Sequence, residues 1–437
     1  MSLRTTFRKP GGLYYGWRML AVGSLMRILG GGLHFYGFTV FFLPLSRDLG
    51  LSRAATSLVF SLARAEGAIE GPLAGYLIDR LGPRPIMLTA LILSGLGYIT
   101  LSQVNTYYTF LLVYLGIISL SFGAGFMHSP MSLANTWFIR RRSTAMGLIS
   151  ASIGMGGALI TPLLAIVVHT WGWRTAAVAA GLSFLCVGIP LASTVRRSPE
   201  SMGLLPDGDR PLTTSGANRH NVPSNPAREI ETDYTLSRAM GTLAFWLIVF
   251  ATMFRAAALS TMMVHFVPIM VWKGLSQQQA AFLLGVMGLL SFCSNLIMGW
   301  LADSANKPRM MSWCTAIGTA SCFLLIYAQE EWLLWFFLPL FVVLESVFPI
   351  TWATVGDIFG RSHFAKIRGT MSFFYMWGGV IAPVLAGRIY DQSQSYSSML
   401  WILVAVLIVS ALLYTLLAKP WAHSLAERRT LHLNLKS

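Results

Sequence analysis

Apolar residues occur along this chain in runs of about 20, and short segments rich in charged residues, glycine and proline separate the runs. An apolar helix of that length crosses a hydrocarbon layer about 30 Å thick. The pattern therefore predicts an all-α membrane protein with twelve transmembrane helices, at 17–42, 54–77, 86–102, 108–133, 144–168, 175–193, 242–271, 278–301, 310–328, 332–355, 369–390 and 397–417. The first and seventh runs exceed the length needed, so we expect those helices to be tilted or bent.

A polar segment divides the twelve runs into two sets of six. Residues 195–240 are rich in Pro, Ser, Asn and Arg and contain almost no apolar run, which is typical of a flexible linker. We therefore predict an N-terminal six-helix bundle over 1–194, the linker over 195–240, and a C-terminal six-helix bundle with a polar tail over 241–437.

The two sets of six repeat one another in sequence. Gly75 and Asp79 recur as Gly299 and Asp303, 224 residues later. The same offset relates segments 44–52 and 268–276, and an offset of 221 or 222 relates the glycines and proline of the fifth and eleventh runs. Two parallel repeats joined by a linker are the pattern of a secondary transporter built from pseudo-symmetric bundles.

Composition narrows the class of protein. Hydrophobic residues make up 55% of the chain. Charged residues make up 11%, against roughly 25% in soluble domains. The formal net charge of +15 lies in turns between apolar runs and no nucleic-acid-binding motif accompanies it, so we expect no nucleic-acid partner. The four cysteines lie inside apolar runs without metal-ligand spacing, and we expect neither a metal nor a cofactor.

Lys and Arg are distributed unequally between the two sets of turns. Of the 32, 24 lie on the side that holds both termini and the linker, five lie on the other side, and three lie within apolar runs. Positive residues concentrate on the cytoplasmic side of membrane proteins. We therefore expect both termini and the linker to be cytoplasmic.

Over nearly its full length the sequence resembles the major facilitator superfamily. The motif G-x-x-x-D-R-x-G-x-R over 75–84 is similar to the loop of this superfamily between helices 2 and 3, and 299–309 is similar to its copy between helices 8 and 9. Segments 14–18, 44–53 and 172–174 resemble bacterial carboxylate porters of the oxalate/formate and monocarboxylate type. The resemblance implies two six-helix bundles and a central cavity lined by helices 1, 4, 7 and 10.

Two positions depart from the carboxylate porters that the chain resembles. Those porters usually carry an Arg in helix 8, where this chain has Asn295. They also carry a basic residue in helix 11, where this chain has no Lys or Arg between Thr370 and Gly387. A bound carboxylate would need its counter-charge from another part of the chain.

Two arginines near the middle of the bilayer supply such a charge. Arg27 in helix 1 and Arg255 in helix 7 lie 10 and 13 residues into their apolar runs. A charged side chain there costs at least about 2.5 kcal/mol, so it normally faces a cavity or a partner. Arg binds carboxylates in a bidentate manner and stays protonated, so we predict that Arg27 and Arg255 face each other and bind an anion. The other interpretation is that structural acids neutralise both. Further candidates for the substrate site are Tyr36, His265, Asn295 and Tyr375, although packing is the simpler role for the aromatic residues.

Three acids and a third arginine also lie within apolar runs. Glu66 and Glu70 are one helical turn apart in helix 2, which also holds Arg64, and Glu345 lies in helix 10. A buried Glu without a cation favours its neutral form, so each acid is a candidate for the coupling proton. Because helix 10 is expected to line the cavity, we favour Glu345 for the proton. We favour pairing with Arg64 or Arg27 for the two helix 2 acids.

Histidines in helices 1 and 4 are further candidates for proton transfer. His34 and His128 both lie within apolar runs, and imidazole changes its charge near neutral pH. A lone His in a helix is more often simply hydrogen-bonded, which is the simpler interpretation of both.

The charged loop after helix 2 is expected to control access. The resemblance implies that it closes the cytoplasmic side through charge contacts with neighbouring helix ends, and its residues are Gly75, Asp79, Arg80, Gly82 and Arg84. We expect Asp79→Asn to lower transport and leave substrate binding largely intact. Asp303 and Arg309 should act similarly but more weakly, because the second copy matches the motif less well.

Together these features predict a secondary active transporter that moves a small organic anion, a mono- or dicarboxylate, by alternating access with proton coupling or exchange. We expect a monomer embedded in the lipid bilayer, in the bacterial cytoplasmic membrane. Two alternatives stay open: a facilitator for a neutral or cationic solute whose intramembrane Arg and Glu residues are structural, and a transporter-like sensor. The sequence shows no nucleophile–base constellation, so we do not expect an enzyme.

Overall fold

The computed structural model describes residues 14–51, 53–209 and 233–434, and every regular element in these ranges is a helix. Spans 1 to 6 are, in order, α1 (Tyr15–Gly30) with α2 (Gly37–Asp48); α3 (Arg53–Leu81); α4 (Pro83–Leu101); α5 (Tyr107–Val113), α6 (Leu120–Phe122) and α7 (Ser129–Trp137); the first part of α8 (Arg142–Ser183); and the last part of α8 with α9 (Ile189–Ser193). Spans 7 to 12 are α11 (Leu243–Trp272), α12 (Gln277–Ser304), α13 (Lys307–Tyr327), α14 (Glu331–Glu345) with α15 (Val347–Phe359), α16 (Phe364–Ser393) and α17 (Ser397–Asn434).

The helices account for all twelve predicted spans. Within the described ranges, nine helical stretches are long and apolar enough to cross a membrane, and one of them, 142–193, contains both span 5 and span 6. Gly172 separates these two spans, because its φ of 82° interrupts α8. Spans 1 and 2, which carry the buried Arg27 and Glu70, lie outside that set and complete the twelve.

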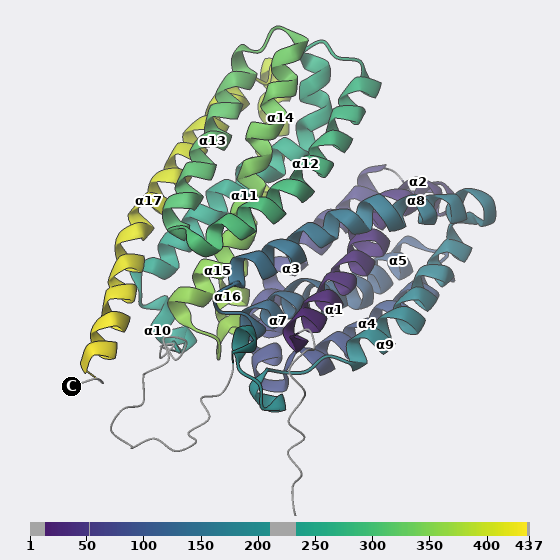
Figure 1. Cartoon of the computed structure of the whole chain (residues 1–437). Coiled ribbons are helices and arrows are strands. Elements are labelled where there is room, and N and C mark those ends of the chain that lie inside the picture. The colour runs from purple at the N-terminus through teal and green to yellow at the C-terminus, as the bar shows by residue number, and fades with distance from the viewer. Residues whose placement is uncertain (1–13, 52, 210–232, 435–437) are drawn as a thin grey trace, which may run out of the picture.

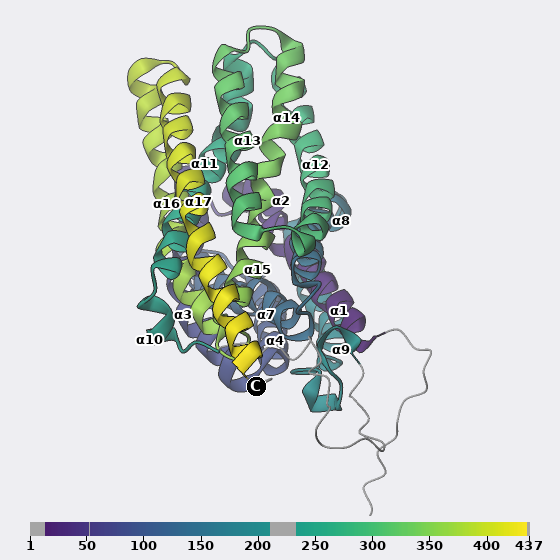
Figure 2. The same ribbon diagram turned by 60° about the vertical axis from the view of Figure 1, so that its left-hand side comes forward.

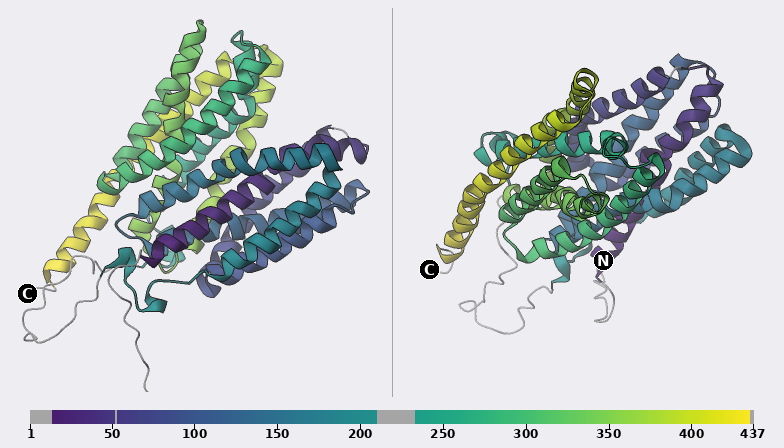
Figure 3. Two further views of the ribbon diagram at one scale, coloured as in Figure 1. Left: turned by 45° about the vertical axis from the view of Figure 1, so that its right-hand side comes forward. Right: turned by 90° about the horizontal axis from the view of Figure 1, so that it is seen from above.

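The spans form two bundles (Figure 1). Helices α1 to α9, in purple to teal, make up the first bundle, and α11 to α17, in green to yellow, make up the second. The bundles meet at the end where the linker and the C-terminus lie, which we call the linker end, and they diverge away from it (Figures 1 and 3). In the second bundle α13 and α14 pack side by side (Figure 2).

The sequence repeat is also a repeat of backbone conformation. Gly50 follows span 1 with a φ of 61°, and Gly274, 224 residues later, follows span 7 with a φ of 99°. Glycine adopts this left-handed region without the steric cost that a side chain brings. The shared turn therefore requires glycine at both positions.

The two most extensive contacts between the bundles are helix crossings of similar construction. Where α3 crosses α16, a Cβ atom at position 369 would lie 1.9 Å from the carbonyl oxygen of Gly71. Where α8 crosses α12, a Cβ atom at position 147 would lie 2.7 Å from the carbonyl oxygen of Asn295. Small residues allow helix backbones to approach closely in membranes. Glycines thus bring the two bundles together at the linker end.

We expect Gly369→Ala to weaken this contact. An overpacked side chain costs about 1–3 kcal/mol, and 1 kcal/mol would raise the population of molecules open at the linker end about fivefold. The measurement is the rate at which an impermeant thiol reagent labels a cysteine placed at Ser132, which lines a pocket at the linker end, in a background without the native cysteines. Gly285→Ala is the control, because no atom lies within 4 Å of its added Cβ. Equal labelling of the two variants would contradict the prediction.

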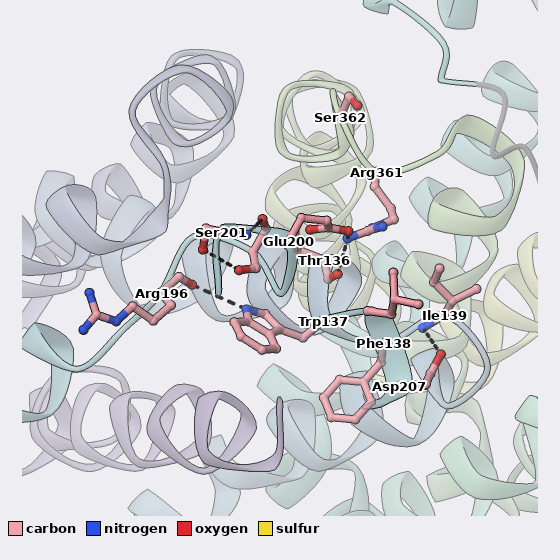
Figure 4. Close-up of polar contacts among 12 residues, drawn as sticks. Thr136, Trp137, Phe138, Ile139, Arg196, Glu200, Ser201, Asp207, Arg361 and Ser362 are labelled. Carbon is pink, nitrogen blue, oxygen red and sulfur yellow. Dashed lines mark hydrogen bonds and ion pairs between the residues drawn. The ribbon is translucent and has the colours of Figure 1, made fainter. Parts of the chain in front are cut away.

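The described parts of the linker that was predicted over 195–240 include regular structure. Its described parts contain the short helices η5 (Glu200–Met202), η6 (Pro206–Gly208) and α10 (Leu236–Met240), whereas 210–232 lie outside the described residues. Asp207 accepts hydrogen bonds from the N–H groups of Ile139 (Figure 4) and Arg140, both at 2.9 Å. A carboxylate that caps a turn in the first bundle anchors the beginning of the linker there.

Arg361 connects the linker to both bundles. It precedes α16 and donates to Glu200 of the linker at 2.9 Å and to the carbonyl oxygen of Thr136 in α7 at 2.6 Å (Figure 4). Asp233, at the other end of the linker, accepts from the N–H groups of Arg361 and Ser362. Burial by itself raises the pKa of Asp233, but the hydrogen bonds outweigh burial and hold the pKa below its ordinary value. This stabilisation is present above the ordinary pKa and is lost as the pH falls through the lowered one.

Candidate functional site

A cavity of about 490 Å³ lies between the two bundles. Side chains from spans 1, 2, 4 and 5 line it on one side, and side chains from spans 7, 8, 10 and 11 line it on the other. The volume falls in the range of small-molecule sites. Among the described side chains, three guanidinium groups line the cavity, those of Arg27, Arg255 and Arg368, and none of these residues is more than 3% exposed.

Arg27 lines the cavity from span 1. Its Nε donates to the carbonyl oxygen of Ile149 at 3.4 Å, and its Nη1 donates to that of Phe126 at 3.5 Å and contacts the sulfur of Met127. Among the described residues it forms no ion pair, so the interpretation in which a structural acid neutralises Arg27 is not what the structure shows. Among the charged groups, Arg368 has the largest electrostatic effect on Arg27.

Arg368 is the functional candidate that sequence reasoning missed. The predicted span 11 began at residue 369. In the structure α16 begins at Phe364, so Arg368 lies inside this helix, next to Gly369 at the crossing with α3. Its Nη1 donates to Nδ1 of His128 at 2.8 Å, and its guanidinium lies 4.8 Å from the ring centre of Trp352. It supplies the basic residue of helix 11 that the chain was expected to lack.

The signal that could have found Arg368 is helical periodicity. Residues 368, 372, 375, 376 and 379 share one face of α16, and all five line the cavity. Ser372, Tyr375 and Gly379 stand in the predicted apolar run, and Arg368 is one turn before Ser372. Extending that face by one turn across the predicted boundary leads to Arg368.

Arg255 lies in a separate polar group on the second bundle. Its charge interacts with that of Glu345, whose carboxylate accepts a hydrogen bond from the hydroxyl of Ser291. Arg255 donates weakly to the carbonyl oxygen of Leu344 at 3.5 Å, and its Nε has no hydrogen-bond partner. Asn295, which also lines the cavity, donates to the carbonyl oxygen of Ser291 and keeps its own oxygen without a partner. Arg27 and Arg255 therefore share a cavity, but each has a different charged neighbour.

The two acids of α3 are not paired as predicted. Glu70 lines the cavity and is 7% exposed, and neither Glu66 nor Glu70 forms an ion pair with any described residue. Oε1 of Glu70 and Oε2 of Glu66 have no hydrogen-bond partner. The side chain of Arg64 lies outside the described residues.

The histidines have different surroundings. His34 lines the cavity in the π-helical segment η1 (Gly31–Phe35), and its Nδ1 bonds the hydroxyl of Tyr98 at 3.2 Å. His128 accepts from Arg368, so its Nδ1 carries no proton in this arrangement. His265 does not line the cavity, because its Nε2 donates to the carbonyl oxygen of Pro383 at 3.0 Å in the contact between α11 and α16. A substrate role for His265 therefore has no geometric support.

The aromatic candidates line the cavity at two places. Tyr36, after η1, is 38% exposed and packs over Gly157 of α8, where an added Cβ would lie 2.6 Å from its ring. Tyr375 lies on α16 with its ring 5.8 Å from that of Trp352. Both are among the lining residues, so both are in reach of a bound ligand.

Two aspartates close the linker end by capping helices of the opposite bundle. Asp79, at the end of α3, accepts from the N–H groups of Ala365 and Lys366 at 3.2 and 2.8 Å, at the start of α16. Asp303, at the end of α12, accepts from the N–H groups of Ser143 and Thr144 at 2.7 and 3.1 Å, at the start of α8. A carboxylate at a helix N-terminus is favourable because the unpaired N–H groups carry partial positive charge. Asp303 also accepts from the Thr144 hydroxyl, so the expectation of a weaker second copy has no support here.

The other loop residues contribute less to closure. Gly75 permits the crossing, because an added Cβ would lie 2.1 Å from the carbonyl oxygen of Ala365, and Gly82 begins the turn with a φ of 88°. Three arginines of the two loops are exposed and form no ion pair among the described residues: Arg80, Arg84 and Arg309. Two buried cations at this end, Arg142 and Lys307 of the second loop, both pair with Asp357 at 2.7 Å.

Comparison with known families decides the class of protein. The sequence profile of the Major Facilitator Superfamily matches residues 20–344 and 246–437, which together cover most of the chain. The chain belongs to the major facilitator superfamily. The predicted family and the twelve-helix fold are thereby confirmed.

Relatives of this superfamily member include vertebrate transporters. Monocarboxylate transporter 12-B of Danio rerio is 22% identical over 391 residues, which span 86% of this chain and 81% of that protein. Monocarboxylate transporter 11 of Homo sapiens is 23% identical over 399 residues, which span 88% and 79%. These relatives are vertebrate proteins and give no support to the expected bacterial membrane.

Solved structures of the superfamily share the fold. The proton:xylose symporter XylE matches with a TM-score of 0.69 and 17% identity, over 91% of this chain and 94% of XylE. The human organic anion transporter MFSD10 matches with a TM-score of 0.66 and 16% identity, over 93% of this chain and all of MFSD10. This superfamily member is thus a multi-pass membrane transporter and not an enzyme.

Proposed function

We propose that this transporter moves a small organic anion, in the first instance a monocarboxylate, by alternating access. The observation that carries the proposal is the pair Arg27 and Arg368, two buried guanidinium groups that line one cavity, contact the same residue, Met127, and have no acidic partner among the described residues. Two like charges that are buried without a counter-ion are costly, and a bound anion removes that cost.

The chemistry of the pair suits a carboxylate. Each guanidinium offers several N–H donors in a planar fork, and Nε of Arg368 has no hydrogen-bond partner. His128 holds one edge of Arg368 and Met127 lies between the two arginines, contacting Nη1 of each. We propose that one carboxylate accepts from both groups.

Arg255 is proposed to bind the other end of the substrate. Its Nε has no hydrogen-bond partner, and Asn295 beside it has an unpaired side-chain oxygen. Glu345 partly offsets the charge of Arg255, so this region suits a hydroxyl, a keto group or a second carboxylate. Tyr36 and Tyr375 would enclose the substrate from the walls of the cavity.

The relatives support the same substrate class. Several are monocarboxylate transporters by name, and a structural neighbour is an organic anion transporter. From the excess of Lys and Arg at the linker end we propose that both termini and the linker are cytoplasmic. In that orientation the closed linker end corresponds to an outward-facing state, and transport is coupled to protons or to exchange.

The test is counterflow of radiolabelled lactate in proteoliposomes that contain the purified protein. We expect labelled lactate to accumulate against unlabelled lactate inside, and we expect pyruvate and oxalate, but not a neutral sugar, to compete. The alternative facilitator for a neutral or cationic solute would be supported instead if no carboxylate competed and a neutral or cationic solute did.

A further inference from the structure

Glu70 is a buried carboxyl group for which the proposed anion site has no use. It lies on α3, lines the cavity, and is 93% buried, and its Oε1 has no hydrogen-bond partner. No described residue forms an ion pair with it. A carboxylate removed from water without a cation or a donor is far less stable than the neutral acid.

The backbone opposite Glu70 is shaped to admit its carboxyl group. Gly123 in span 4 faces it so closely that an added Cβ would lie 1.4 Å from Oε1 of Glu70. Any side chain at position 123 would displace the carboxyl group from this place. The arrangement therefore depends on glycine across from the acid.

Glu345 is different and better suited to remain charged. It receives a hydrogen bond from Ser291 and interacts with the positive charge of Arg255. Its Oε2 thus has a donor and its charge has a cation, while its Oε1 has no hydrogen-bond partner. Among the described residues Glu70 has neither a donor nor a cation. This reverses the preference for Glu345 that the sequence suggested.

The charged and titratable groups around Glu70 leave it without a described counter-ion. Glu66 lies one turn earlier on the same helix and repels it. The other charged and titratable groups that line the cavity are Arg27, His34, Tyr36, Tyr114, His128, Arg255, Glu345, Arg368 and Tyr375. His34 is held by Tyr98, and Arg368 is held by His128. The side chain of Arg64 is outside the described residues.

We propose that Glu70 is the site at which this transporter takes up and releases a coupled proton, an inference that rests on the proposed anion transport. When the cavity is open, Oε1 binds one proton from water and the carboxylate becomes a neutral carboxyl group. Neutral Glu70 no longer repels the carboxylate of the substrate in the same cavity, so proton and anion load together. The proton leaves the same oxygen when the cavity opens at the linker end, and no other reactant is needed.

The experiment compares Glu70→Gln with the wild-type protein in proteoliposomes. Glutamine has the shape of the neutral acid and binds no proton. We expect lactate counterflow at equal pH within about twofold of wild type, and we expect the accumulation driven by a pH gradient to be lost. Glu331→Gln is the control, because Glu331 is exposed at the start of α14. Gradient-driven accumulation in Glu70→Gln at the wild-type level would overturn the proposal. So would loss of counterflow together with accumulation, since Glu70 would then be a substrate ligand or a structural residue.

A second measurement needs no substrate and separates this proposal from the proposed function. Infrared difference spectra recorded across a pH step report the C=O stretch of a protonated buried carboxyl group. We expect that band in the wild-type protein and in Glu345→Gln, and we expect it to be absent in Glu70→Gln. If the band persisted in Glu70→Gln, the proposal would be wrong even if lactate were transported. If the band behaved as expected while no carboxylate were transported, only the anion assignment would fail.

Discussion

Arg368→Gln is expected to weaken lactate binding about 100-fold. Truncating one partner of a buried, hydrogen-bonded charge pair costs about 2–5 kcal/mol, and about 3 kcal/mol corresponds to that factor. Arg27→Gln should have a similar effect, because both guanidinium groups line the cavity without an acidic partner among the described residues. The measurement is the dissociation constant of lactate for the purified protein by calorimetry.

Controls for this prediction come from the same helix and from the double variant. Arg388 lies on α16 but is exposed, so Arg388→Gln should bind lactate as the wild-type protein does. Because Arg27 and Arg368 are proposed to bind one carboxylate, the double variant should lose less affinity than the sum of the two single losses. Arg368→Lys keeps the positive charge but loses the planar fork of N–H donors. Its affinity for lactate should therefore lie between those of the wild-type protein and Arg368→Gln. Unchanged affinity in both Gln variants would contradict the anion site.

The second large effect is expected from the two capping aspartates. Asp79→Asn and Asp303→Asn each replace a charged acceptor at a helix N-terminus by a neutral one, which costs about 1 kcal/mol. Together the substitutions should shift the equilibrium away from the state closed at the linker end by roughly 30-fold. Counterflow should slow in each single variant and most in the double variant, while the affinity for lactate changes little.

The shift can be measured directly. Spin labels at the linker ends of α3 and α16 report the distance between the bundles, and we expect a longer distance to gain population in the double variant. Asp209→Asn is the control, because Asp209 lies in the linker and pairs with the exposed Arg140. If Asp303→Asn behaved as the wild-type protein while Asp79→Asn did not, the equivalence of the two caps would be wrong.

Much of the fold could be predicted because each transmembrane helix corresponds to an apolar run in the sequence. The repeat offset of 224 also located paired features, since Gly50 and Gly274 both have positive φ and Asp79 and Asp303 both cap a helix of the other bundle. The depth of Arg27 in its apolar run predicted that this side chain faces a cavity, because an arginine exposed to lipid is costly.

Other features depend on contacts that span lengths do not encode. Arg368 was missed because hydropathy ends a span at the first charged residue, whereas the helix itself continues in the protein interior. His265 lies within the apolar run of span 7, but its Nε2 donates to the carbonyl oxygen of Pro383 in a helix contact. The docking of the linker through Asp207 and Glu200 could not be read from a segment of low hydrophobicity.

The central claim is that Arg27 and Arg368 together bind a carboxylate, and a structure determined with lactate bound tests it most directly. We expect both oxygens of the lactate carboxylate within hydrogen-bond distance of the two guanidinium groups, in the cavity between the bundles. Lactate bound elsewhere, with Arg27 and Arg368 each paired to a glutamate of the protein, would contradict the account.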